Sequence, residues 1–243
     1  MTATVTSVNV GLPREAAWAG IGRTSIDKQP VRGPVLARRL GLDGDRVSDT
    51  KYHGGVDRAV YAFAREDLDA WAADLGLEIR DGQFGENLTT SGIDVNEAEV
   101  GERWLVGDAV FEVAAVRIPC NDFKVWMGRC GYDSRAWVKR FAATGRPGPY
   151  LRVLTEGEVR AGDELTVTHR PGHGVTVSTM FRADDRARAA PGAAAGGRPP
   201  RRGPRQGRGV RGRHDPAGGG RRRRGPPILM LRPVRLPVRN PVL

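Results

Sequence analysis

Three short stretches of this 243-residue chain bring together residue types that can do chemistry. The first spans residues 51–58 and reads KYHGGVDR, with Lys51, His53 and Arg58 around a glycine pair. Glycines let the backbone approach a ligand closely, and cationic side chains donate hydrogen bonds to anions. The pattern is typical of an anion site. An ordinary Gly-Gly turn with solvated charges also explains it, and this stretch taken alone favours the turn.

The second stretch spans residues 82–88 and reads GQFGENL, a loop with two glycines. Asn87 offers an amide to a ligand, and Glu86 offers a carboxylate. A turn in which Glu86 accepts backbone hydrogen bonds explains the same residues equally well. This stretch by itself is therefore only a weak indication of a site.

The third stretch is RIPC, which places Cys120 in a loop whose conformation Pro119 restricts. Arg117 lies three residues before this cysteine, and Lys124 lies four residues after it. Nearby cations favour the thiolate, which is the form that attacks as a nucleophile or binds a soft metal. The alternative is a small buried apolar cysteine, which is the commoner fate of a free thiol.

The elements that must position these stretches are mostly short β-type runs separated by Gly, Asp and Pro, as in a barrel or a sandwich. The clearest run, 109–116, is mainly apolar in both alternating sets and predicts a strand buried on both faces as far as Arg117. Cys120 follows just beyond its end. The predicted strands are 4–10, 34–39, 59–63, 103–106, 109–116, 150–154 and 164–168.

Two segments, 65–75 and 134–143, carry apolar residues at the three- and four-residue intervals of an amphipathic helix. We expect Ser134 to be the N-cap of the second helix. Gly76 and Gly145 follow the two helices as stop signals. Both helices are predicted to pack on the outside of the sheet.

Charge and composition change abruptly at residue 184. Residues 184–243 hold sixteen Arg, no Lys and three Asp, a net charge of +13, so residues 1–183 carry −2 while the chain totals +11. The basic balance therefore belongs to the tail, which argues against a nucleic-acid-binding role for the whole chain. The tail also has eleven Gly, ten Pro and no aromatic residue, and such a segment cannot bury enough apolar surface to offset chain entropy.

The sequence thus predicts a β-barrel domain over 1–170, the start of a helical extension over 171–183, and a low-complexity disordered tail over 184–243. Arg, Gly, Pro and Ala are also what GC-rich coding sequence yields in a wrong reading frame. Two interpretations of the tail stay open, a frameshifted extension and a genuine disordered basic tail.

The two cysteines give neither a disulfide framework nor the spacing of a structural zinc site. Cys130, between Arg129 and Gly131, has no chemical context comparable with that of Cys120 and is assigned to packing. The chain opens without a signal-peptide pattern, and eighteen apolar residues nowhere occur together. We expect a soluble, cytoplasmic protein.

Taken in order, these stretches resemble the MOSC domain family and, within it, the YiiM-type subfamily, which is associated with detoxifying hydroxylaminopurine. The resemblance covers about residues 3–182, and the ordered combination of motifs is more specific than any one motif. The motifs are KYHGGVDRAVY at 51–61, GQFGENL at 82–88, RIPC at 117–120, and G-x-P-G-x-Y-L-R-V-L followed by G-x-V-x-A-G-D within 145–163.

The resemblance implies a mainly β fold, a β-barrel of the MOSC or pyruvate-kinase-barrel-like type with a few peripheral helices. It also implies the molybdenum cofactor, molybdopterin, with Cys120 as the catalytic residue and thiolate ligand of the metal. A dianionic pterin phosphate needs fixed cations and N–H donors, which the 51–58 loop can provide. The residues expected to hold cofactor or substrate are Lys51, His53, Arg58, Asn87, Arg117 and Lys124.

The activity implied by the resemblance is molybdenum-dependent reduction of N-hydroxylated bases or related compounds. The implied partners are the small substrate and a separate flavin-containing electron donor protein, with no membrane and no specific nucleic acid. The chain departs from the subfamily pattern directly after Cys120, where Asn121 and Asp122 stand in place of an aromatic residue and a lysine. Whether Lys124 replaces that lysine, and which substrate is used, stay open.

Two further functions also stay open. In the first, Cys120 carries sulfur as a persulfide for delivery to metal centres, a role that requires an exposed reactive cysteine. In the second, the Arg-rich tail binds nucleic acid without specificity and with a steep salt dependence. The nearly neutral domain gives this second idea no support, because it offers no stripe of basic and aromatic residues.

Overall fold

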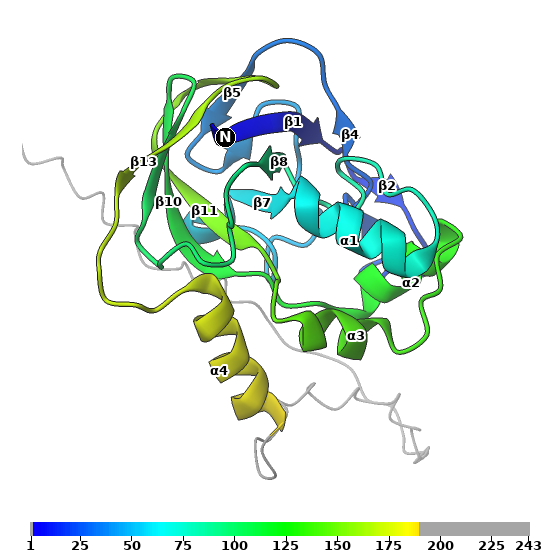
Figure 1. The fold of residues 1–243 in the computed structure, drawn as a ribbon. Coiled ribbons are helices and arrows are strands. Elements are labelled where there is room, and N and C mark those ends of the chain that lie inside the picture. Colours follow the sequence, from blue (N-terminus) through cyan, green and yellow to red (C-terminus); the bar gives the residue numbers. More distant parts are fainter. Residues whose placement is uncertain (1, 190–243) are drawn as a thin grey trace, which may run out of the picture. The chain divides into compact units, whose positions relative to one another are not determined.

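The structure is a computed structural model that describes residues 2–189, and β-strands make up most of its elements (Figure 1). The strands are β1 (Thr4–Val10), β2 (Arg14–Glu15), β3 (Arg23–Thr24), β4 (Gln29–Pro30), β5 (Val35–Arg38), β6 (Gly41–Leu42), β7 (Val60–Ala64), β8 (Leu88–Ser91), β9 (Arg103–Val106), β10 (Ala109–Val116), β11 (Pro149–Thr155), β12 (Gly157–Val159) and β13 (Leu165–His169). The helices are η1 (Val56–Arg58), a single 3-10 turn, and α1 (Arg65–Leu75), α2 (Asn121–Arg129), α3 (Trp137–Thr144) and α4 (Val177–Ala189).

One eight-stranded sheet, in the order β13-β9-β10-β11-β7-β8-β1-β4, dominates the fold. Its neighbours run antiparallel except β7 and β8, which are parallel and are connected through α1. Parallel neighbours need such a crossover, because a tight turn can join only antiparallel strands. A three-stranded sheet, β12-β5-β6, and a two-stranded hairpin, β2-β3, accompany the main sheet.

The expected closed barrel is not confirmed. The main sheet has two ends, β13 and β4. The chain entering β13 does approach β1, because Thr4 and Glu164 form an isolated antiparallel bridge and the Val5 N–H donates to the Asp163 carbonyl at 2.9 Å. A single bridge is not a continuous ladder. Residues 2–189 therefore form a mainly β fold with one large mixed sheet and four α-helices.

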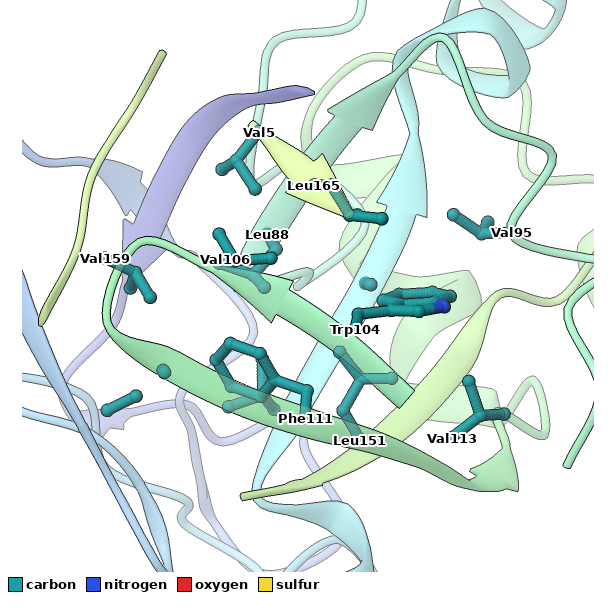
Figure 2. Close-up of a cluster of buried hydrophobic side chains, with 14 of the residues drawn as sticks. Val5, Leu88, Val95, Trp104, Val106, Phe111, Val113, Leu151, Val159 and Leu165 are labelled. Atoms are coloured by element: carbon teal, nitrogen blue, oxygen red, sulfur yellow. The ribbon is translucent and has the colours of Figure 1, made fainter. Parts of the chain in front are cut away.

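Apolar side chains of the main sheet form the first hydrophobic core, shown in Figure 2. Trp104, Phe111 and Leu151 come from the neighbouring strands β9, β10 and β11 and are fully buried. The indole N–H of Trp104 donates to the buried Glu102 carboxylate at 2.8 Å. The polar atom of this large core side chain is therefore satisfied, as the burial of an indole requires.

A second, aromatic core lies where α1, α2 and α3 cover the sheet. Strand β7 contributes to both cores, because Val60 and Ala62 belong to the first while Tyr61 and Phe63 belong to the second. Successive strand side chains point to opposite faces, so this strand is buried on both. The Phe84 ring centroid lies 5.1 Å from that of Phe123 in α2, an edge-to-face packing that holds the start of that helix against the loop before β8.

All seven strands predicted from sequence are confirmed to within one residue at each end, and the first predicted helix has the observed bounds of α1. Gly76 and Gly145 end α1 and α3 in the left-handed conformation, with φ of 66° and 64°. No sequence pattern predicted α2, β8, β12 or the two-residue strands β2, β3, β4 and β6. The residues of α2, NDFKVWMGR, include few strong helix formers, and packing of Phe123 and Met127 into the aromatic core stabilises the helix instead.

Two local predictions are wrong. Ser134 is not a cap, because α3 begins at Trp137 and its N-cap residue is Ala136, which has a positive φ of 49°. Strand β10 is not fully buried on both faces. Its buried residues alternate from Ala109 to Val113 with partly buried ones, because only one face meets the first core.

Helix α4 begins within the predicted helical extension and continues past residue 183 to Ala189, the last residue described. Val177 and Phe181 attach it to the first core. Most of the tail that was predicted to be disordered, residues 190–243, lies outside the described residues. Within the described part of the chain, no helix has the length and apolar character needed to cross a membrane.

Glycine is required at position 148, directly before β11 begins. Its φ is +72°, and a side chain there would collide with the Ala62 carbonyl oxygen in β7. We expect Gly148→Ala to lower the free energy of unfolding by about 3 kcal/mol, because it combines backbone strain with a clash against fixed backbone. The measurement is urea denaturation.

The matched control is Gly162→Ala. Gly162 also has a positive φ of 96°, but nothing lies within 4 Å of the added carbon. In this control the free energy of unfolding should fall only by the cost of backbone strain, about 1 kcal/mol. If both variants lost the same free energy of unfolding, the close approach of Gly148 to the β7 backbone would be contradicted.

Candidate functional site

A cavity lies where several loops and strand ends meet beside the start of α2. Its walls come from segments that are far apart in the sequence, including the chain around β3, the loop after β6, η1 with β7, and the loop between β10 and α2. Its lining residues with polar or ionisable side chains are Arg23, Thr24, Ser25, Lys28, Asp45, Ser48, Asp49, His53, Arg58, Tyr61, Asn87, Arg117, Cys120, Asp122 and Tyr150.

Arg117 is the most unusual of these residues, because it carries a permanent charge and is only 5% exposed. One of its nitrogens, Nη1, donates to the Phe84 carbonyl at 2.7 Å. The guanidinium carbon lies 4.9 Å from the Tyr61 ring centroid and 4.4 Å from that of Phe123. Two aromatic faces and one carbonyl therefore hold the charge in place.

No carboxylate pairs with Arg117 among the described residues, and its buried Nε has no hydrogen-bond partner there. A buried charge without a counter-charge is costly, because the lost hydration is not replaced. Guanidinium keeps its proton at any ordinary pH and so cannot escape this cost by neutralising. A cavity wall with such a charge is suited to an anionic ligand or to a thiolate.

Cys120 stands at the N-cap position of α2, half-buried, with an extended backbone at φ −126°. Free backbone N–H groups and the positive end of the helix dipole gather at a helix start. Arg117 lies three residues earlier in the same short loop. The local chain thus places one thiol between the first turn of α2 and a buried guanidinium, in the wall of the cavity.

A second buried cation, Lys28, is paired. Its ammonium bonds to the Asp45 carboxylate, and the two side chains are 8% and 3% exposed. Burial lowers the pKa of Lys28, and Asp45 opposes that shift. The same carboxylate accepts from the Gly11 N–H at 2.7 Å and from the Asn87 amide at 3.1 Å. Asp45 therefore fixes the lysine in the cavity wall.

Five of the residues predicted from sequence to form the site line this one cavity: His53, Arg58, Asn87, Arg117 and Cys120. The other two, Lys51 and Lys124, are not among its lining residues. The Lys51 side chain is exposed, and its ammonium lies 5.0 Å from the Tyr52 ring centroid. Lys124 lies one turn into α2, where its N–H donates to the Cys120 carbonyl at 3.2 Å.

Asn87 lines the cavity, but its amide is used by the fold. The amide oxygen accepts from the Tyr61 N–H at 3.1 Å, and the amide nitrogen donates to the Asn9 carbonyl as well as to Asp45. This residue therefore supports the wall behind Lys28 and Asp45.

Glu86 has the structural role that the sequence left open as an alternative. Its fully buried carboxylate accepts from the N–H groups of Gly82 and Phe84, at 2.5 and 2.9 Å. Burial raises the pKa of Glu86 to about 7, against the lowering effect of these donors. The GQFGENL stretch is thus a turn closed on its own carboxylate, and it presents the Phe84 carbonyl to Arg117.

His53 is half-buried in the cavity wall, and its backbone N–H donates to the Asp49 carbonyl at 2.9 Å. Burial lowers the pKa of His53, and the positive charge of Arg117 lowers it further. The imidazole therefore stays neutral at pH 7 and can act as both donor and acceptor towards a ligand.

Several lining residues were not anticipated, chiefly Lys28, Asp45, Tyr61 and Tyr150. Lys28 and Asp45 lie in irregular chain, and no local pattern marks a pair separated by seventeen residues. The two tyrosines lie within the motifs at 51–61 and 145–163. That position was the only sequence feature that could have indicated a role in the site.

Asp122, one of the two residues that depart from the subfamily pattern, also lines the cavity. Both oxygens of its carboxylate accept from the Gly20 N–H, at 3.2 and 3.1 Å. In the same region the Trp18 and Trp126 rings stack at 6.5 Å. These contacts tie the loop of the β2-β3 hairpin to α2, so Asp122 holds one wall of the cavity closed. Among the described residues, no group of three or more His, Cys, Asp or Glu side chains forms a metal-ligand cluster.

Comparison with known proteins places these residues within one family. A family model described as the MOSC domain matches residues 49–166, which include Cys120 and just over half of the residues that line the cavity. The chain is 31% identical over 179 residues to YflK of Bacillus subtilis, covering 73% of this chain and 79% of YflK.

It is also 33% identical over 172 residues to a protein named Reductase from Gibberella moniliformis, covering 68% of this chain. The match spans only 29% of that longer protein. Among solved structures, YiiM from Geobacillus stearothermophilus superposes with a TM-score of 0.63 at 25% identity, covering 77% of this chain and 86% of YiiM.

The pairing of Lys28 with Asp45 is testable by a double-mutant cycle. Asp45→Asn should lower the free energy of unfolding by about 3 kcal/mol, because it leaves a buried ammonium without a counter-charge. Adding Lys28→Met should recover part of that loss, which gives a coupling energy above about 1 kcal/mol. Denaturant unfolding measures all three variants.

The control is Asp43→Asn, which removes the exposed ion pair between Arg38 and Asp43 and should leave stability unchanged. Additive effects at positions 28 and 45 would show that the buried pair does not form.

The state of His53 is testable by NMR titration, with His53→Gln assigning its signal. We expect its pKa to lie below the ordinary value of about 6.5. In Arg117→Met the pKa should rise, because a nearby positive charge that opposes protonation has gone, and burial should still hold it below the ordinary value. A pKa at or above the ordinary value in the unmodified chain would contradict the arrangement of His53 and Arg117.

Proposed function

This chain belongs to the MOSC domain family, of the YiiM type, and we propose that it binds the molybdenum cofactor beside Cys120 and reduces N-hydroxylated bases or related compounds there. MOSC domains are associated with binding of this cofactor in general. The observation that carries the proposal for this chain is the buried, unpaired Arg117 next to a half-buried thiol in one cavity.

The residues present fit the cofactor chemically. Molybdopterin carries a phosphate, and a phosphate is the counter-charge that the orphaned Nε of Arg117 lacks. Arg58 adds positive charge to the same wall, Lys28 stands there as an ammonium paired with Asp45, and neutral His53 adds a ring N–H. Cys120 would supply a thiolate, which is a ligand suited to a soft metal centre.

When bound, the cofactor supplies transfer of an electron pair, and the protein supplies binding and orientation. Arg117 and Lys28 act from fixed positions, because aromatic rings hold the first and Asp45 holds the second. Fixed donors cost no reorganisation when charge develops during a reaction. Asp122 keeps the β2-β3 hairpin over the cavity and so helps to exclude water.

The net reaction converts R₂N–OH, two electrons and two protons into R₂N–H and water. The electrons come from a separate flavin-containing protein, which is part of the proposal. The name Reductase borne by one relative is consistent with chemistry of this type. That name refers to a protein of which this chain matches less than a third, so it supports the reaction class and not the substrate.

Metal analysis of the purified full chain tests the assignment of Cys120. Molybdenum should be present in the unmodified protein, lost in Cys120→Ala and retained in Cys130→Ala. Cys130 is a suitable control because it is equally half-buried but lies at the far end of α2. Reduction of an N-hydroxylated purine by a chemically reduced flavin donor should follow the molybdenum content. Equal molybdenum loss in both variants would overturn the role of Cys120.

Sulfur carriage is the second candidate, because the same half-buried cysteine at a helix start could hold a persulfide. It predicts a different composition of the native protein. Mass spectrometry would then find one extra sulfur that cyanide removes, in a chain without molybdenum. That result would replace the reductase proposal.

A further inference from the structure

Tyr150 belongs to the G-x-P-G-x-Y motif, which the proposed function leaves without a role. It lies in β11, directly opposite Tyr61 of β7 in the antiparallel ladder, and the two ring centroids are 5.4 Å apart. Both side chains line the cavity that also holds Cys120. The strand pairing therefore sets two phenol rings side by side at the wall next to the thiol.

The two hydroxyl groups differ in one respect. The Tyr61 hydroxyl donates to the Pro147 carbonyl at 2.8 Å and is buried. The Tyr150 hydroxyl has no hydrogen-bond partner within residues 2–189, and its side chain is only half-buried. Tyr150 is thus free to donate its proton to a molecule in the cavity, whereas Tyr61 is committed to the fold.

Other groups in the cavity wall are poorer proton donors. The hydroxyls of Ser25 and Ser48 bond to each other at 2.6 Å, and aliphatic hydroxyls are weaker acids than a phenol. Lys28 is held on Asp45, and arginines do not release their protons. His53 is neutral near pH 7, because burial and Arg117 disfavour its charged form.

The surroundings of Tyr150 act on its proton in opposite directions. Burial, together with the nearby Cys120, favours the protonated phenol, whereas the positive charges of Arg117 and Arg58 favour phenolate. Burial has the larger effect and keeps the pKa of Tyr150 above its ordinary value. The phenol therefore stays protonated at rest. It therefore carries a proton that a departing hydroxide, a strong base, can take.

We propose that Tyr150 is a catalytic residue that donates the proton to the hydroxyl group leaving nitrogen when the N–O bond breaks. This inference rests on the proposed reductase function. The N–O bond of R₂N–OH breaks as two electrons arrive from the reduced flavin donor. The oxygen takes the Tyr150 proton and leaves as water, and the nitrogen takes a second proton from solvent. The phenolate, held beside Arg117 and Arg58, then regains its proton from solvent.

The test is Tyr150→Phe, which keeps the ring and its packing and removes only the hydroxyl. We expect kcat for an N-hydroxylated purine to fall by about 100-fold, the usual contribution of one positioned acid. Molybdenum content should not change, and KM should change little.

Tyr52→Phe is the matched control, because Tyr52 is 60% exposed and does not line the cavity. It should leave kcat unchanged. A readout independent of turnover uses fluorotyrosine, since the chain has four tyrosines and hence four resolvable ¹⁹F signals. The signal that disappears in Tyr150→Phe should shift when the N-hydroxylated purine is added to protein without an electron donor, and the Tyr52 signal should not.

The outcomes separate the two proposals. If the unmodified protein neither holds molybdenum nor reduces the purine, the proposed function fails and the role of Tyr150 falls with it. If the unmodified protein is active and Tyr150→Phe keeps its kcat within about threefold, the proton-donor role alone is overturned. If the ¹⁹F signal of Tyr150 did not shift on addition of the purine, the proton-donor role would also be overturned, because the hydroxyl would not contact the substrate.

Discussion

The buried guanidinium of Arg117 is the constraint around which the site is built. Two aromatic rings and one backbone carbonyl hold it, yet none of the described carboxylates neutralises it. The surrounding packing therefore has to offset the cost of keeping this charge out of water. The Tyr61 ring comes from β7 and the Phe123 ring from α2, so one charge joins the sheet to the helix that Cys120 begins.

Two cores of different character support that arrangement. The first core consists of apolar sheet side chains and sets the register of β7, β10 and β11. The second core is aromatic and holds α2 against the sheet. Because β7 is buried on both faces, a change at either core is transmitted to the strand that carries Tyr61. The geometry of the cavity therefore depends on long-range packing more than on any local motif.

The polar residues of the cavity divide into those that hold the site and those that are free to act. Asn87 and Asp45 form hydrogen bonds with each other and with backbone groups, and the Asp122 carboxylate accepts from a backbone N–H. These three residues therefore shape the cavity walls. Arg117, Cys120 and Tyr150 keep unsatisfied donors or reactive atoms at the cavity. Sites commonly combine a rigid supporting network with a few groups left without partners, because preorganised groups need not reorganise during the reaction.

The sequence by itself determined the strands with clear alternation, the amphipathic helix α1, the glycine stops at Gly76 and Gly145, and the position of Arg117 and Cys120 in one short loop after β10. These features are local, and their physical signals lie within a few residues. Only the tertiary structure decided that Lys28 pairs with Asp45, that Glu86 closes its own turn, that α2 forms at all, and that Lys51 stays outside the cavity. Each of these depends on burial and on partners distant in the chain, and a short stretch of sequence does not determine which of its residues become buried.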